Sequence, residues 1–514
     1  MKATVFVLGL LFAVHGTLSS RILFIQTSPS VSHAFPINKV IESLLRRGHH
    51  VTHISADLLE TNHANYSTVS TRESYKFVED FNISTMADTW PMLLAEAYHE
   101  EGITMCHLQF NLPQMKEWLK KDEKFDLVVT ERLPFQCYYG LVHRAGRPPL
   151  VGIVTLPAMM PSHYTIGNPT NPAYLPDVFV GLPDRMTFWQ RLYNTYHYLR
   201  FMHYWFYTVL PEHEAVMRQY FGPDPPSVFE TERNFSLLIV TAHFSSHYPR
   251  PNLPNVIELT GLHVETDTKP LPQELQEFLD GAKHGAIYFS LGTNVRSSTL
   301  PPHTVQAFLE AFRELPQRIV WKWENGSLPW KPDNVLVGKW FPQQDILAHP
   351  NVKLYIMQGG LQSINEAAYR AIPLIAIPFF SDQTHNAAKI DFSGIGLRLC
   401  LKDITKESVL RSVQTVLGNP KYRENMKQYS ILFREHRQHS VETAVWWLEY
   451  VIRHNGAPHL RSAAVDLYWW QLLLLDVIGF LLLVVGFAVA VVYFGTRKLI
   501  KALTSKKHVK TKKQ

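Results

Sequence analysis

Two kinds of residue in this chain are suited to chemistry: glycines that let a phosphate approach a helix, and histidines that can take a proton. Gly359 and Gly360 follow an apolar run at 354–357 and precede a helical pattern over 363–369. Such a turn can bring a phosphate to the N-terminal amides of a helix, although a Gly-Gly pair also fits an ordinary tight turn. A neutral histidine suits removal of a hydroxyl proton. The chain has 25 histidines, however, and composition singles out none of them.

Metal and cofactor binding have little support in the sequence. Two histidine groups lack the acidic or third helical ligand that a zinc-protease motif would supply. Three cysteines cannot form a four-ligand zinc site or a disulfide framework, so at most one bridge is possible. No GxGxxG motif follows a strand, which argues against a dinucleotide. We therefore expect no metal and no cofactor. The residues concerned are His49, His50 and His53, the pair His243 and His247, and the cysteines Cys106, Cys137 and Cys400.

The elements that would position such groups form two α/β halves. In the first half, buried strands are expected at 22–25, 50–55, 127–130 and 150–154, with a helix at 36–47 and aromatic helical segments over 188–210. In the second half the pattern restarts, with strands at 286–291, 318–322, 354–357 and 374–378 and a helix at 302–314. Strands alternating with helices indicate parallel crossover units.

A break in composition separates the halves. Prolines crowd positions 249–272, which is typical of a linker. Two doubly wound domains joined in this way face a cleft, and ligands bind such folds at the carboxyl ends of the strands. The expected fold class is therefore α/β, with two Rossmann-like domains and a ligand cleft between them.

The two ends of the chain predict a membrane topology. Residues 1–20 have the layout of a secretory signal peptide. Residues 477–494 are 18 residues without a charge, enough to span about 27 Å as a helix, with Trp469 and Trp470 as interface anchors. Residues 495–514 hold eight cations and no acid, and subtracting these from the net charge of +6 leaves −2 for the rest. A single-pass protein with a cytosolic tail follows, and a nucleic-acid partner loses its support.

Short motifs agree with a body outside the cytosol. The last five residues carry lysines three and five positions from the end, which resembles a di-lysine signal for the endoplasmic reticulum. Four N-glycosylation sequons begin at Asn65, Asn82, Asn234 and Asn325, and they are compatible with exposure in the lumen.

The segment 340–383 resembles the UDP-glycosyltransferase signature. It begins Trp340-Phe341-Pro342-Gln343-Gln344-Asp345, continues through Gln358-Gly359-Gly360-Leu361-Gln362-Ser363-Ile364-Asn365-Glu366, and ends at Asp382-Gln383, with no insertion or deletion over 44 residues. Ser290-Leu291-Gly292-Thr293 is similar to the first strand and loop of that family's donor domain. The segments 453–461 and 476–480 resemble its animal, membrane-anchored branch.

The resemblance implies a GT-B fold and a donor site in the second domain. Trp340 would stack on uracil, Gln343 would contact base or ribose, and Glu366 would accept from the ribose hydroxyls. Ser363, Thr293 and the helix amides after Gly359 and Gly360 would hold the diphosphate. Asp382 and Gln383 would bind the sugar, with Asn386 assisting. Gln358 stands where many members have a histidine; it can donate a hydrogen bond but cannot become cationic, as the resemblance suggests for invertebrate relatives.

The resemblance also places a base. His33 follows the first strand by a short loop, at the position of the family's catalytic histidine. Its orienting acid would be Glu131, where the family commonly has an Asp. Glu is one methylene longer, so a solvated or salt-bridged Glu131 stays an alternative.

We therefore expect a signal peptide (1–20), an acceptor-binding domain (21–250), a linker (251–276), a UDP-sugar-binding domain (277–455), a pre-membrane segment (456–475), a transmembrane helix (476–494) and a basic cytosolic tail (495–514). The expected activity is transfer of a sugar, glucose first, from a UDP-sugar to a hydroxyl of a small lipophilic acceptor, with inversion. UDP-glucuronate as donor, or a non-catalytic membrane-anchored binder of UDP-sugar or a lipophile, are the alternatives. The location would be the endoplasmic reticulum membrane with a lumenal body, and a homo-oligomer stays open.

Overall fold

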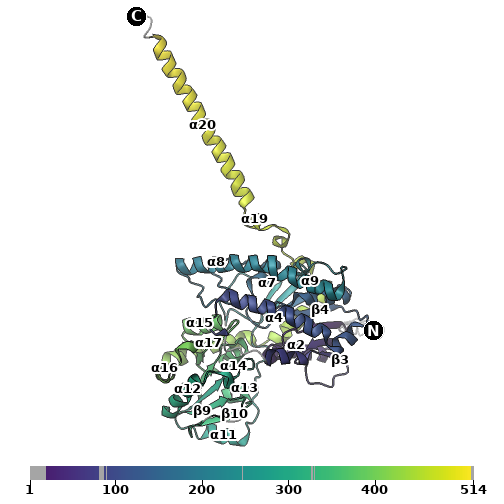
Figure 1. Cartoon of the computed structure of the whole chain (residues 1–514), viewed down its shortest axis with the longest axis vertical. Helices are drawn as coiled ribbons and strands as arrows, with labels where there is room; N and C mark the ends of the chain where they lie inside the picture. Colours follow the sequence, from purple (N-terminus) through teal and green to yellow (C-terminus); the bar gives the residue numbers. More distant parts are fainter. Residues whose placement is uncertain are drawn as a thin grey trace, which may run out of the picture. The chain divides into compact units, whose positions relative to one another are not determined.

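The computed structural model describes residues 19–79, 86, 87, 89–245, 247–325, 328 and 330–510. Each half of the chain forms one parallel sheet with helices packed against it (Figure 1). The expected signal peptide lies almost wholly outside the described residues, as do the sequon at Asn82 and residues 511–514 of the lysine motif.

The first sheet has seven parallel strands in the order β3-β2-β1-β4-β5-β6-β7. The second has six parallel strands in the order β10-β9-β8-β11-β12-β13. The strands are β1 Arg21–Ile25, β2 His50–Ser55, β3 Tyr66–Ser70, β4 Leu127–Glu131, β5 Leu150–Val154, β6 Phe235–Val240, β7 Val256–Glu258, β8 Ala286–Ser290, β9 Arg318–Lys322, β10 Val335–Gly338, β11 Val352–Met357, β12 Leu374–Ala376 and β13 Gly396–Arg398.

Helices cover both faces of each sheet because the strands are apolar on both faces. In the first half these are α2 Val31–Arg46, α3 Tyr75–Glu79, α4 Pro91–Asn111, α5 Pro113–Leu119, α6 Tyr139–Arg144, α7 Met160–Thr165, α8 Phe188–Tyr204, a π-helical turn η4 Trp205–Val209, α9 Leu210–Phe221 and α10 Val228–Glu232. In the second half they are α11 Gln273–Asp280, α12 Pro302–Glu314, α13 Gln343–Ala348, α14 Leu361–Arg370, α15 Gln383–Phe392, α16 Lys406–Gly418, α17 Pro420–Arg437 and α18 Ser440–Arg453.

In each sheet the strand order reverses between two neighbouring strands. From β1 the chain continues outward through β2 and β3, and from the adjacent β4 it continues the other way. The second sheet repeats this pattern at β8 and β11. At such a point the connections diverge, which leaves a crevice at the carboxyl ends of the two strands. The two-domain α/β fold expected from the sequence is therefore confirmed.

Two segments differ from the expected domain limits. The expected linker, 251–276, contains β7, which is the edge strand of the first sheet. Helix α18 lies within the expected second domain but packs on α2 and on one face of the first sheet. Its Glu449 carboxylate accepts from Arg47 at 3.0 Å and lies 3.2 Å from the ring of His49. After completing the second domain, the chain thus returns to the first one. The two domains are therefore connected by the chain at two places.

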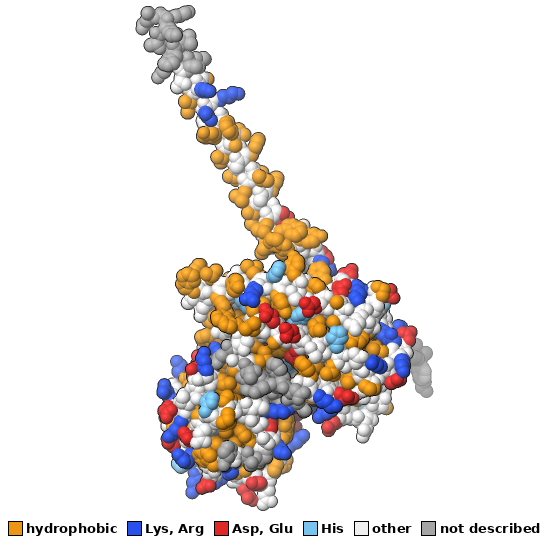
Figure 2. Space-filling model, viewed as in Figure 1, with side chains coloured by type: hydrophobic (Ala, Val, Ile, Leu, Met, Phe, Trp, Pro, Cys, Tyr) orange, Lys and Arg blue, Asp and Glu red, His pale blue; other side chains and the backbone are white. Residues whose placement is uncertain are grey.

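The last part of the chain is a separate compact unit, 462–514. It contains η8 Ala463–Asp466, α19 Trp469–Leu472 and α20 Leu475–Lys510. Within the described residues, one helix is long and apolar enough to cross a membrane, at Leu475–Thr504. Figure 2 shows hydrophobic side chains along α20, followed by Lys and Arg. The helix contains the expected span, 476–494, and continues into the segment expected as a tail.

Candidate functional site

A histidine and a glutamate are joined at the crevice of the first sheet. His33 lies in the first turn of α2, just after β1, and Glu131 is the last residue of β4. Nδ1 of His33 lies 2.7 Å from Oε1 of Glu131. The Glu131 side chain is fully buried, and 15% of the His33 side chain is exposed. The pairing leaves Nε2 of the ring as the nitrogen available to a ligand.

The glutamate is fixed by three donors. Besides His33, the backbone N–H of Ser28 donates to Oε2 at 3.1 Å and the hydroxyl of Thr155 donates to Oε1 at 3.3 Å. These bonds fix the position of the carboxylate, whose oxygens can accept from several donors at once. The longer glutamate side chain therefore reaches the histidine, and the sequence-level alternative of a solvated Glu131 does not describe this geometry.

The electrostatics of His33 follow from this pairing. Burial lowers the pKa of His33, but the charge and hydrogen bond of Glu131, with smaller contributions from Asp382 and Glu101, raise it, so that the net pKa lies above the usual value. A proton on this ring is thus stabilised by a buried negative partner, as a general base requires after it has accepted a proton.

The second sheet presents glycines and an amide at its crevice. Gly292, after β8, has φ +81°, and a Cβ there would lie 2.4 Å from Nε2 of Gln358. Gly359, after β11, has φ +92°, and Gly360 caps the N-terminus of α14. Oε1 of Gln358 is buried without a hydrogen-bond partner among the described residues. A side chain at these glycines would crowd Gln358 and narrow the approach to the first turn of α14. With glycine there, a ligand can approach the backbone amides at the N-terminus of the helix.

A hydrogen-bonded group lies along α14. Nε2 of Gln343 donates to the Ser363 hydroxyl at 3.0 Å and to Glu366 at 2.5 Å. The hydroxyl of Tyr355 donates to Oε1 of Gln343 at 2.8 Å. The ring of His263 lies 3.4 Å from the other Glu366 oxygen. The expected ribose-binding residues are thus brought together, although sequence reasoning missed His263 because it belongs to the expected linker.

The side chain of Trp340 is largely exposed to solvent. Its side chain is 61% exposed, and the Lys322 ammonium lies 5.6 Å from its ring centroid. A large exposed aromatic surface is typical of a binding platform. Thr293 lies in the loop after β8, where its hydroxyl donates to Asn294 at 3.3 Å.

Asp382 and Gln383 begin α15. The Asn386 amide donates to Oδ2 of Asp382 at 2.7 Å, and the backbone N–H of Phe379 donates to Oε1 of Gln383 at 2.9 Å. Burial raises the pKa of Asp382 to about 6, against the opposing effect of the Asn386 bond. The Asp382 carboxylate is therefore buried, lines the cavity and is fixed by the Asn386 amide.

A cavity of about 280 Å³ joins the two crevices. Of the expected site residues, His33, Gln358, Gly360, Asp382 and Gln383 line it. The remaining expected donor-binding residues lie outside its lining, in the loop after β8, around Trp340 and along α14. His33, Asp382 and Gln383 therefore share one cavity, and the residues expected to bind the nucleotide lie outside its lining.

The first domain gives this cavity an apolar wall with polar groups from α4. Tyr98 and Glu101 line it together with apolar residues that include Phe77, Phe135, Phe179, Leu156 and Met159. Sequence reasoning missed these residues because no motif marks them. The aromatic residues considered from the sequence, Tyr193, Tyr196, Tyr198, Phe201 and Trp205, do not line the cavity; Phe201 and Trp205 belong to the core.

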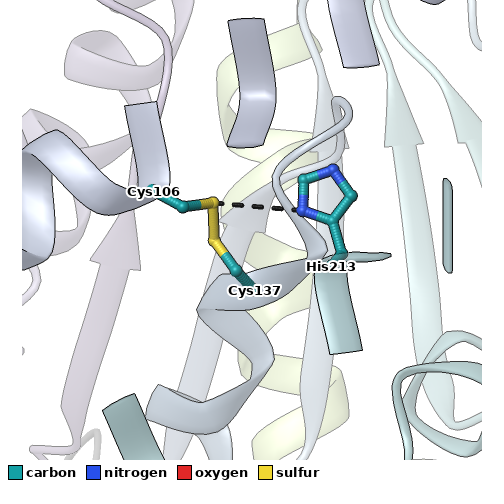
Figure 3. A group of neighbouring side chains, drawn as sticks. All are labelled: Cys106, Cys137 and His213. Carbon is teal, nitrogen blue, oxygen red and sulfur yellow. Dashed lines mark hydrogen bonds between the residues drawn. A yellow bond between two sulfur atoms is a disulfide. The ribbon is translucent and has the colours of Figure 1, made fainter. Parts of the chain in front are cut away.

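The histidines and cysteines weighed as metal ligands have other partners. His247 pairs with Asn386 at 3.0 Å and His53 with the Tyr66 hydroxyl at 2.9 Å. Cys106 and Cys137 form a disulfide, beside the buried ring of His213 (Figure 3). This bond ties α4 to the short helix η3, Gln136–Tyr138, and it occupies both sulfurs, so they are not free to bind an ion. It is the one bridge that the cysteine count allowed.

The fold resembles solved glycosyltransferase structures. The calicheamicin glycosyltransferase CalG4 aligns with a TM-score of 0.57 at 19% identity, covering 85% of this chain and 99% of that one. The spinosyn forosaminyltransferase SpnP aligns with a TM-score of 0.54 at 16% identity. These likenesses show that the chain has the two-domain GT-B fold.

Sequence comparison gives the family. The model of UDP-glucoronosyl and UDP-glucosyl transferases matches residues 21–514, and the chain belongs to that family. UDP-glucosyltransferase 2 of Dactylopius coccus is 44% identical over 380 residues, covering 74% of this chain and 73% of that protein. UDP-glucuronosyltransferase 2A1 of Mus musculus is 29% identical over 484 residues, covering 90% of each. The chain is therefore an enzyme that transfers a sugar from a UDP-sugar.

Trp340 provides a test of the nucleotide site. Replacement of Trp340 by Ala removes the stacking surface and should weaken UDP binding about 10-fold, because base stacking on an aromatic contributes about 1–3 kcal/mol. Calorimetric titration of the detergent-solubilised protein with UDP measures this effect. Trp446→Ala, at another exposed tryptophan, is the control and should bind UDP as the wild type does. Equal losses in both variants would show that Trp340 has no special role.

Proposed function

We propose that this enzyme transfers glucose from UDP-glucose to a hydroxyl of a small lipophilic acceptor. The observation that carries the proposal is the His33–Glu131 pair at 2.7 Å on the same cavity as Asp382 and Gln383. The apolar wall from the first domain favours a lipophilic acceptor. Its hydroxyl would lie against Nε2 of His33 and its ring against the phenylalanines.

The proposed step is a direct displacement. Nε2 of neutral His33 takes the proton of the acceptor hydroxyl while that oxygen bonds to the anomeric carbon and the bond from that carbon to the UDP oxygen breaks. Glu131 stabilises the imidazolium, and the helix N-terminus at Gly360, with Gln358 and Thr293, faces the departing diphosphate. Attack on the face opposite UDP inverts the anomeric centre. UDP-sugar serves as a co-substrate, and the step as proposed uses no metal or other cofactor.

Charge favours glucose over glucuronate. The described residues that line the cavity include Glu100, Glu101 and Asp382 but no Lys or Arg. A glucuronate carboxylate would lie near Asp382, which we assign to the sugar, and like charges repel strongly at low dielectric. UDP-glucuronate is the second candidate donor, since the mouse relative is named as a glucuronosyltransferase.

We further propose an endoplasmic reticulum location with a lumenal body. The helix at Leu475–Thr504 supports membrane anchoring. The eight cations of 495–514 support a cytosolic tail by the positive-inside rule. Asn65 and Asn234 would then be open to glycosylation.

The base is tested by two variants. His33→Ala should lower kcat/KM with UDP-glucose by about 100-fold or more, because general-base catalysis contributes 10²–10⁴-fold. Glu131→Gln removes the charge that raises the pKa of His33, so the acid limb of kcat/KM should move to lower pH while the plateau falls. A pH profile measured with a neutral phenol checks both. Full activity of His33→Ala, or an unmoved acid limb in Glu131→Gln, would reject these roles.

Donor choice is tested by direct comparison. The kcat/KM with UDP-glucose should exceed that with UDP-glucuronate by about 10-fold or more. This ratio corresponds to about 1.4 kcal/mol, which we attribute to repulsion between the glucuronate carboxylate and the acidic side chains of the cavity. Product analysis by NMR should show a β-glucoside from the α-linked donor. A preference for UDP-glucuronate would transfer the assignment to the second candidate, and an α-glucoside would exclude direct displacement.

Topology is tested by glycan removal. Cleavage of N-glycans should increase the gel mobility of the full chain expressed in animal cells, and Asn65→Gln with Asn234→Gln should reduce that shift. Protease added to sealed microsomes should remove only an epitope placed after Gln514. Protection of that epitope would contradict a cytosolic tail.

A further inference from the structure

One carboxylate on the acceptor side of the cavity has no partner. Glu101 lies on α4, on the face that also presents Ala97, Tyr98 and Thr104 to the cavity. This spacing repeats every three to four residues and so defines one side of the helix. No hydrogen bond or ion pair joins the side chain of Glu101 to another residue within the part of the chain that the structure describes.

Of the other carboxylates, Glu100 also lines the cavity but is exposed to solvent, and Glu131 and Asp382 are already engaged. Glu131 accepts from His33, Ser28 and Thr155, and Asp382 accepts from Asn386. Burial raises the pKa of Glu101 to about 7, and His33 opposes the rise only in part. An ionised carboxylate held in an apolar wall is costly until a cation or donor meets it. Glu101 is thus the carboxylate to which a ligand can supply the missing hydrogen bond or ion pair.

The surroundings fit a cation on an aromatic molecule. Tyr98 and Phe179, which both line the cavity, stack with ring centroids 5.8 Å apart, and aromatic faces attract organic ammonium groups. His33 and Glu101 line the same cavity, so one small molecule can contact both. The volume of about 280 Å³ suits a molecule of one or two rings.

We propose that Glu101 binds a cationic nitrogen of the acceptor, which makes small phenols bearing an alkylammonium group the preferred acceptor class. This inference rests on the proposed function, since it assumes that the acceptor hydroxyl lies at His33. Glu101 acts as a specificity residue: it contacts the acceptor at the end opposite the reacting hydroxyl. It lies in the middle of α4, and the Cys106–Cys137 disulfide holds that helix one turn further on.

Two isosteric acceptors test the proposal. Tyramine and 4-propylphenol have the same phenol and nearly the same shape, but only tyramine carries an ammonium group. With the full chain in detergent, UDP-glucose and a pH of about 8, wild type should give the higher kcat/KM with tyramine. Glu101→Gln should lower kcat/KM for tyramine about 10- to 100-fold, mainly through KM, and change that for 4-propylphenol less than about 3-fold.

The ratio between the acceptors separates binding from an effect on the base. Loss of the Glu101 charge also changes the field at His33, but that change acts on both phenols alike. Glu117→Gln, which removes the same charge from an exposed residue of α5 outside the cavity lining, is the matched control and should keep the tyramine preference. UDP affinity equal to that of wild type checks that both variants are folded.

The outcomes are distinct. Equal loss with both acceptors in Glu101→Gln, or loss of the preference in Glu117→Gln alone, would overturn the role of Glu101. Competition of the two acceptors in one wild-type reaction needs no variant, and a wild type that favours 4-propylphenol would overturn the acceptor class while leaving the proposed function intact. Transfer to neither acceptor would overturn both proposals.

Discussion

The reversal of strand order in two parallel sheets is the constraint on which this molecule depends. At β1 and β4, and again at β8 and β11, the connections run outward in opposite directions, so the carboxyl ends of each strand pair stay open. His33 and Glu131 come from one such opening, and the glycine turns at Gly292 and Gly359 come from the other. Glu131 ends a buried strand and His33 lies in the helix turn that follows its neighbour strand, so packing leaves both little freedom.

Transfer of a sugar between ligands bound at the two openings requires the two domains to hold these openings opposite each other. The amide of Asn294 donates to the Ser30 hydroxyl at 3.1 Å, and that of Gln362 donates to the Thr155 carbonyl at 2.6 Å. Helix α18 crosses back to pack on α2. A base and an anomeric carbon must approach within contact distance for transfer, and prior alignment removes much of the entropic barrier. These contacts set that alignment before any substrate binds.

The distribution of charge around the cavity links catalysis to selectivity. Carboxylates surround His33, while lysine and arginine are absent from the described residues that line the cavity. In a site with little water, such charges act strongly on a nearby proton or ligand. Glu131 raises the pKa of His33, Asp382 lies on the same cavity, and the Glu101 side chain has no hydrogen-bond partner among the described residues. The proposed imidazolium and the proposed preference for a neutral sugar both depend on these charges.

The sequence by itself determined the two α/β halves and the apolar helix near the C-terminus, because local periodicity encodes them, and it marked the donor segment 340–383 through its resemblance to the family signature. It also marked His33 and Glu131, but only through resemblance, since 98 residues separate them. Helix α2 begins at Val31 rather than Pro36, and α18 and β7 belong with the first sheet. Only the tertiary structure decided these helix and strand assignments and the positions of Glu101 and His263 at the site. The reason is that they depend on contacts between distant segments, which no local sequence pattern records.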